Sequence, residues 1–173
     1  AAKIAFSTAG AATAIVGSPT PPQNPPDGAS TVSTLGIASS RGLAGELRQR
    51  YVAAAALLPE AVRNLRIKIS GCFNSCGQHH IADIGFYGNS RNVGGYTVPH
   101  FQVMLGGQWT ENAGSYALAM GSVPSKAIPD LVTALTQRWI ADRQGEESFQ
   151  AWCGRIGKKE LKGIVDKFTT VPP

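Results

Sequence analysis

The sequence is poor in charged residues and contains no long apolar run. Charged residues make up 16% of the 173 residues, against about a quarter in an average soluble domain. The apolar share of 43% is ordinary, which argues against an intrinsically disordered chain, because disorder combines few apolar residues with many charges. No apolar run approaches the roughly 18 residues that a membrane-spanning helix needs, so none is predicted.

Cysteine is also scarce, with Cys72, Cys76 and Cys153 as the whole set. Three cysteines cannot form a disulfide framework, and Cys72 and Cys76 lie too close together to staple a fold usefully. The sequence therefore favours a reducing compartment, the cytoplasm, where thiolates stay available as metal ligands.

The net charge of +5 is unevenly placed. Residues 1–34 contribute nothing, whereas residues 35–68 carry six basic residues against Glu46 and Glu60. Such an excess suits an anionic partner, which is a nucleic acid, a phosphate or a cofactor with several carboxylates, although a solvated helix face gives the same pattern. The basic residues are Arg41, Arg48, Arg50, Arg63, Arg66 and Lys68.

Residues 1–34 differ in character from the rest of the chain. They hold eight alanines and five of the eleven prolines, and no apolar periodicity runs through them. We therefore expect an Ala/Pro-rich arm or linker over 1–34 and a folded domain over 35–173. Lys3 and the small apolar residues after it faintly resemble a secretory signal, but polar residues interrupt the apolar stretch.

The remaining sequence alternates between helical and strand patterns. Because helices and strands are interleaved, we predict an α/β or α+β domain with helices packed on a mixed sheet. Residues 89–95 are rich in turn formers. The patterns predict a helix over 41–58, ended by Pro59, strands over 65–69, 81–87 and 98–105, and helices over 129–143, 147–156 and 158–168.

The residues best suited to chemistry form a loop directly after the first predicted strand. Cys72 and Cys76 stand four residues apart, and the nearby Gly71 and Gly77 let the backbone approach a bulky group. Thiolates select zinc, copper(I) or iron–sulfur clusters. In the competing interpretation both cysteines are small buried hydrophobic residues. We expect Cys153 to be part of the core.

The stretch ISGCFNSCGQH at 69–79, followed by IADIGF at 81–86, resembles the second cysteine pair of the nitrite/sulfite reductase family. Members of that family use sirohaem and a [4Fe–4S] cluster. The likeness also takes in LGIASSRGL at 35–43, VPHF at 98–101 and the sequence through to residue 173. It implies the 4Fe-4S domain fold of the C-terminal half of such an enzyme.

The resemblance also implies roles for individual residues. Cys72 and Cys76 would be two of the four cluster ligands, and Cys76 would bridge the cluster to the sirohaem iron, which receives electrons for a six-electron reduction. Asn74 and Gly77 would tune the cluster through backbone N–H groups. Gln78 and Arg41 complete the implied cofactor-binding set, and Arg41, Arg63, Arg66 and Lys68 are candidate partners for the carboxylates of sirohaem.

The family pattern breaks upstream of residue 35. The first cysteine pair of the family would fall on Asp27 and Ser33, whereas a [4Fe–4S] cluster normally needs four thiolates. Truncation, a shifted reading frame or degeneration would each produce this break. We expect the chain to need the N-terminal half of the enzyme, or another subunit, and an electron donor such as ferredoxin, and to be inactive alone. The sequence does not distinguish nitrite from sulfite.

Other hypotheses remain for the loop, the histidines and the basic segment. Cys72, Cys76, His79 and His80 form a compact set that would suit structural zinc. His79, His80 and His100 are candidate proton donors, or else histidines held by structural hydrogen bonds near a sheet. A nucleic-acid-binding module is disfavoured because no aromatic residues are interleaved with the basic segment.

Overall fold

The computed structural model describes residues 5–9, 37–54, 56–109 and 114–171. None of the helices in these ranges combines the length and the apolar composition that a membrane span requires. The strands are β1 (Ala5–Ala9), β2 (Arg66–Ser70), β3 (Ile84–Val93), β4 (Tyr96–Leu105) and β5 (Leu118–Pro124). The helices are α1 (Ser40–Ala53), α2 (Glu60–Arg63), α3 (Ile128–Asp142) and α4 (Phe149–Asp166), with short 3-10 turns η1 (His79–Ile81) and η2 (Ser125–Ala127).

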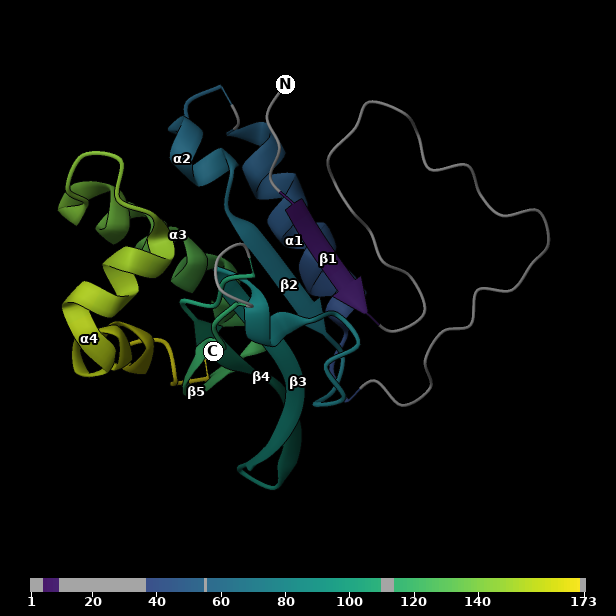
Figure 1. The fold of residues 1–173 in the computed structure, drawn as a ribbon. Coiled ribbons are helices and arrows are strands. Elements are labelled where there is room, and N and C mark those ends of the chain that lie inside the picture. The colour runs from purple at the N-terminus through teal and green to yellow at the C-terminus, as the bar shows by residue number, and fades with distance from the viewer. Residues whose placement is uncertain (1–4, 10–36, 55, 110–113, 172–173) are drawn as a thin grey trace.

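The strands form one mixed sheet in the order β1-β2-β3-β4-β5. The first three strands run parallel, and β3, β4 and β5 are antiparallel neighbours. The predicted mixed sheet with packed helices is therefore confirmed. The β3–β4 hairpin extends beyond the helices at the lower edge of Figure 1.

The helices cover one face of the sheet (Figure 1). Alternate residues of the central strands point to this face, and Ile69, Phe86 and Val103 are fully buried there. They share one hydrophobic core with Leu47 of α1 and Trp152 of α4. Burying a side chain of this size stabilises a fold by about 1.5–3 kcal/mol, so this face holds the domain together.

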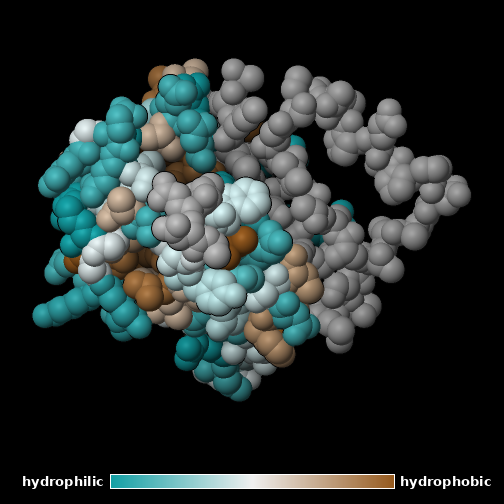
Figure 2. Space-filling view, in the orientation of Figure 1, coloured by the Kyte–Doolittle hydropathy of each residue, from teal (hydrophilic) through white to brown (hydrophobic). Residues whose placement is uncertain are grey.

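The opposite face of the sheet is more polar. Lys68, Tyr87 and Gln102 point to it and are half-buried, and η1 lies on it because Gly85 has no side chain where the carbonyl of His79 approaches. Figure 2 shows the same view in space-filling form. Weakly polar residues, drawn nearly white, gather at the centre of this view. Strongly hydrophilic residues gather at its left, over the helices.

The predicted end of the first helix was wrong. Helix α1 ends at Ala53 and does not reach Leu58, and Pro59 caps a new helix, α2. Leu58, the last residue of the apolar spacing, packs against the hydrophobic core, but it does so from the segment between α1 and α2, while Val52 of the same spacing is 64% exposed.

The turn-rich segment 89–95 is strand for most of its length. The hairpin closes at Gly94 and Gly95, which have φ values of 58° and 86°, as a two-residue hairpin turn requires. The turn signals therefore placed a turn correctly but made it too long.

Two strands were not predicted. β1 lies within residues 1–34, where no element was expected, and becomes a strand by pairing with β2. β5 contains Gly121, and its pairing with β4 is interrupted by a register shift at Val103/Met104, so its sequence does not show regular alternation. The break predicted between the last two helices is present, because Gly157 in α4 has a φ of 82°.

Candidate functional site

The cysteine loop, residues 71–78, begins where β2 ends. The carbonyl of Gly71 accepts hydrogen bonds from the backbone N–H groups of Ile37 (2.9 Å) and Ala38 (3.2 Å). The segment that leads into α1 is thereby fixed beside the start of the loop. These contacts join two parts of the chain that carried the family resemblance.

The two loop cysteines lie outside the hydrophobic core. Cys72 is half-buried and Cys76 is exposed, with its Sγ 3.8 Å from the carbonyl oxygen of Asn74. The exposed fraction of the neighbouring Phe73 is 68%. The interpretation of both cysteines as buried hydrophobic residues is therefore wrong.

Cys153 has the opposite environment. It is 3% exposed and belongs to the hydrophobic core, against Gly106. Burial, and to a smaller extent the nearby Asp83 carboxylate, raises the pKa of its thiol, so it stays protonated and is a poor metal ligand. Its predicted place in the core is confirmed.

His79 lies beneath the cysteine loop. Its Nδ1 is 2.8 Å from Ser70 Oγ, and its Nε2 is 3.4 Å from Ser75 Oγ. Burial, aided by the neighbouring His80, lowers its pKa to about 4, so the ring is neutral near pH 7. For His79 the hydrogen-bonded structural interpretation is confirmed, because both ring nitrogens face serine hydroxyls.

The other two histidines also have fixed surroundings. The Nδ1 of His100 donates to the carbonyl of Val98 at 2.9 Å. The ring of His80 meets Tyr116 edge-on, with centroids 4.9 Å apart, and its buried Nδ1 has no hydrogen-bond partner in the described part of the chain.

Gln78 ends the loop in a left-handed conformation, with a φ of 55°. Its side-chain oxygen accepts a 2.8 Å hydrogen bond from Lys68 Nζ, and the same amine lies 5.3 Å from the ring centre of Trp109. Burial and the charge of Arg66 lower the pKa of Lys68. Gln78 is therefore tied to the sheet.

The predicted basic residues are not equivalent. Arg66 is committed to Asp83, with two guanidinium contacts of 3.0 Å and a backbone N–H bond of 2.8 Å. Arg41 lies exposed on the first turn of α1, and Arg63 is half-buried in α2. Arg41 can therefore bind an external anion, whereas the guanidinium of Arg66 is already paired with Asp83.

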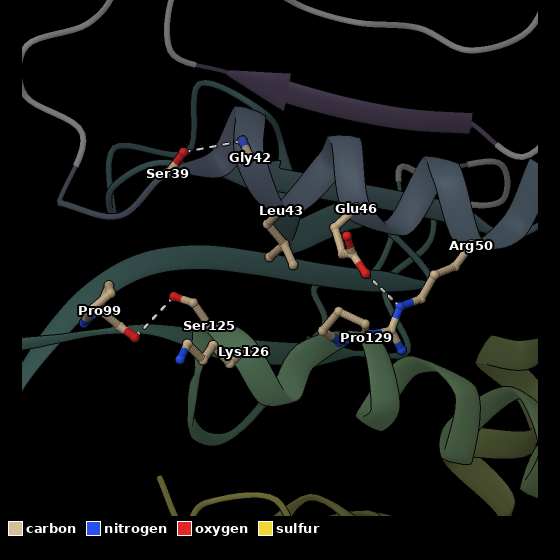
Figure 3. Close-up of a pocket in the computed structure, with 9 residues that line it drawn as sticks. All are labelled: Ser39, Gly42, Leu43, Glu46, Arg50, Pro99, Ser125, Lys126 and Pro129. Carbon is tan, nitrogen blue, oxygen red and sulfur yellow. Dashed lines mark hydrogen bonds and ion pairs between the residues drawn. The ribbon is translucent and has the colours of Figure 1, made fainter. Parts of the chain in front are cut away.

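A groove of about 440 Å³ lies between α1 and the start of α3 (Figure 3). Leu43, Pro99 and Pro129 form part of its wall, and Arg50, bonded to Glu46 and Asp130 at 2.7 Å each, stands at one end. No predicted site residue lines it, and the sequence carried no signal for it because its walls come from three separate segments.

The family assignment follows from comparison with known proteins. The family model of the nitrite and sulphite reductase 4Fe-4S domain matches residues 37–171, most of the chain. The chain belongs to the nitrite and sulphite reductase family.

Relatives in this family include a sulfite reductase [ferredoxin] of Mycolicibacterium paratuberculosis, 34% identical over 57% of this chain and 18% of the relative. A ferredoxin–nitrite reductase of Synechococcus elongatus is 34% identical over 66% of this chain and 23% of its own length. The solved structure of the Mycobacterium tuberculosis NirA protein superposes with a TM-score of 0.57 at 29% identity, covering 70% of this chain and 22% of NirA. The chain thus spans about a fifth of these relatives.

The residues present fit half of a [4Fe–4S] ligand set. Cys72 and Cys76 offer two accessible thiols on one loop, whereas Cys153 is buried. Among the residues that the structure describes, no three His, Cys, Asp or Glu side chains come together to hold a metal ion, so the structure does not favour the zinc hypothesis for Cys72, Cys76, His79 and His80. Asp27 and Ser33 lie outside the described residues.

Proposed function

We propose that this chain is the C-terminal cofactor domain of a nitrite or sulfite reductase, binding a [4Fe–4S] cluster and sirohaem. The observation that carries the proposal is the pair of thiols on one loop at the end of β2, outside the core of a domain that matches the family. In this proposal the domain spans 35–173, preceded by the arm 1–34, which contributes β1 to the sheet.

Cys72 and Cys76 would supply two of the four thiolates that hold the cluster. Cys76 is the more exposed of the two, which supports assigning it as the sulfur shared with the sirohaem iron. When bound, the cluster and sirohaem supply one-electron redox chemistry. The chain's own contribution is to present the two thiols, with Asn74, Gly77 and Gln78 shaping the loop around them.

The exposed guanidinium of Arg41 would pair with a carboxylate of sirohaem, in the bidentate geometry that arginine favours. Lys68 is a weaker candidate, because its amine already bonds to Gln78. Arg66 is weaker still, since Asp83 neutralises its charge.

The remaining two thiolates would come from outside this loop, together with the substrate-binding cations. We propose the N-terminal half of the enzyme, or another subunit, as their source, and a ferredoxin as the electron donor, in a reducing cytoplasmic setting. The isolated chain should accordingly show no steady reduction of nitrite or sulfite with reduced methyl viologen.

The proposal is tested by reconstituting the chain anaerobically with equal amounts of ferrous and ferric iron and with sulfide, in excess 2-mercaptoethanol to fill the two open coordination positions. We expect broad visible absorption and bound acid-labile sulfide in the native chain and in C153S, and loss of both in C72S and C76S. Equal iron and sulfide contents in all four proteins would show that the loop does not bind the cluster.

A further inference from the structure

The ring of His79 bridges the two halves of the cysteine loop. We propose that His79 is a positioning residue, which holds Cys72 and Cys76 in their ligand-presenting arrangement before any iron binds. This inference rests on the proposed function, because it takes the loop to be a ligand loop.

The two serines that contact the ring bracket the cysteines. Ser70, the last residue of β2, precedes Cys72 by two positions and lies 2.8 Å from Nδ1. Ser75 directly precedes Cys76 and lies 3.4 Å from Nε2. One rigid side chain therefore connects the strand to the far side of the loop.

The hydrogen bonds run in one direction through the ring. Ser75 Oγ donates to the carbonyl of Phe73 at 3.3 Å, so it accepts from Nε2–H, since a hydroxyl has a single proton to give. A neutral ring then has a bare Nδ1, which accepts the Ser70 hydroxyl proton. Ser70 Oγ in turn accepts the N–H of Gly77 at 3.3 Å, and this bond closes the loop. In this series of hydrogen bonds, both ring nitrogens of His79 and both serine hydroxyl protons have a partner.

The ring itself is fixed in place. It is 3% exposed, and Tyr87 packs against it with centroids 4.9 Å apart. The carbonyl of the same residue fills the space left by Gly85. Because side chain and backbone are both enclosed, His79 can serve as a template for the more exposed loop above it.

The loop needs such a template, because Cys76 is flanked by residues in an unfavourable conformation. Ser75 and Gln78 have φ values of 56° and 55°, the left-handed region that side chains other than glycine occupy at a cost. Such residues persist where surrounding contacts fix them. A 2.7 Å bond from Gln78 N–H to the Ser75 carbonyl joins them, and His79 anchors Ser75.

The test uses the full chain without iron and follows alkylation of each cysteine by iodoacetamide, read by peptide mass. In the native chain we expect Cys76 to react fastest, Cys72 more slowly and Cys153 hardly at all. Loss of both ring hydrogen bonds in H79L should raise the Cys72 rate about tenfold. His80→Leu removes a histidine from the same turn but no loop hydrogen bond, and should leave the rate unchanged.

Conservative variants separate positioning from mere packing. The amide oxygen of H79N reaches the position of Nδ1 and restores the shorter bond to Ser70, whereas the amide nitrogen of H79Q reaches the position of Nε2 and restores only the longer one. We expect H79N to be closer to the native protein than H79Q, in Cys72 reactivity and in the hydrogen exchange of the Gly77 N–H.

A Cys72 rate that is the same in H79L as in the native chain, or raised equally by H80L, would overturn the inference. Slow alkylation of Cys153 shows that the fold persists in each variant. If H79L proves unfolded, the order of H79N and H79Q decides, and equal behaviour of the two contradicts the inference. Because no iron is present, failed cluster assembly would leave this result intact and would count against the proposed function alone.

Discussion

The two faces of the sheet differ in what fixes them. On the helix-covered face Trp152, Phe86 and Cys153 are buried in a common core, and close packing is the main restraint. On the opposite face Ser70, His79 and Lys68 are held by hydrogen bonds to Gly77, Ser75 and Gln78 of the cysteine loop, respectively. The same residue type shows the contrast, since Cys153 is buried and Cys76 is exposed. Packing of the core and anchoring of the cysteine loop therefore take place on separate faces, and the two can be altered separately.

The largest test of this separation removes a core side chain. Trp152→Ala should lower the free energy of unfolding by about 4 kcal/mol, because the indole is completely buried. Phe73→Ala on the exposed loop should change it by less than about 0.5 kcal/mol. Urea unfolding measures both, and comparable losses would mean that the loop contributes to the core.

A smaller effect is expected where the loop meets the sheet. In Gly85→Ala the new methyl group would overlap the carbonyl oxygen of His79, so the variant should lose about 2 kcal/mol of stability and loosen the loop. Gly45 of α1 has nothing within 4 Å of the corresponding position. Gly45→Ala should therefore stabilise the chain by about 0.5–1 kcal/mol. A lower free energy of unfolding in this variant would contradict the conclusion that the position has room for a methyl group.

The polar face should also give the fold a pH dependence. The pKa of His79 is about 4 in the folded chain and 6.5 without burial, so the unfolded chain takes up the proton first as the pH falls. The stabilising contribution of neutral His79 is complete above about pH 6.5 and is lost progressively toward pH 4. Between pH 6.5 and pH 4 the free energy of unfolding should fall less in H79N than in the native chain. The carboxylates that titrate in the same range are present in both proteins, so their contribution cancels in the comparison. Identical slopes in urea titrations would contradict the assignment.

The smallest effect compares the cysteines themselves. Cys153→Ser places a hydroxyl in the core and should cost about 1 kcal/mol, whereas Cys76→Ser should stay within about 0.5 kcal/mol. The two single substitutions differ by environment alone, so thermal unfolding of both provides the comparison. A larger loss for Cys76→Ser would mean that its sulfur supports the fold without metal.

Local signals predicted much of the fold. The alternation at 65–69 gave β2, the periodicity of 129–143 gave α3, and Gly157 marked the break in α4. The strand β1 escaped detection because its sequence carries no apolar periodicity and it becomes a strand through pairing with β2. The strand β5 escaped because Gly121 and the register shift against β4 interrupt its alternation. The length of α1 was overestimated, because Leu58 continues the apolar spacing and packs against the core, but from beyond the end of the helix at Ala53.

The site was predicted in part. The spacing of Cys72 and Cys76 and the glycines beside them identified the loop, since those residue types are needed wherever thiols approach a bulky group. For His79 the sequence suggested a histidine held by hydrogen bonds but not its partners, because Ser70 and Ser75 give no distinctive pattern. The pairing of Arg66 with Asp83, 17 positions apart, likewise depends on the register of the sheet.

The sequence alone determined the family and the two thiols, because both are written in adjacent residues whose chemistry does not depend on distant contacts. Only the tertiary structure decided which cysteines are accessible, which arginine is free and what holds the loop. Those properties arise from burial and from hydrogen-bond geometry, and both exist only once separate segments are brought to the same face of the sheet.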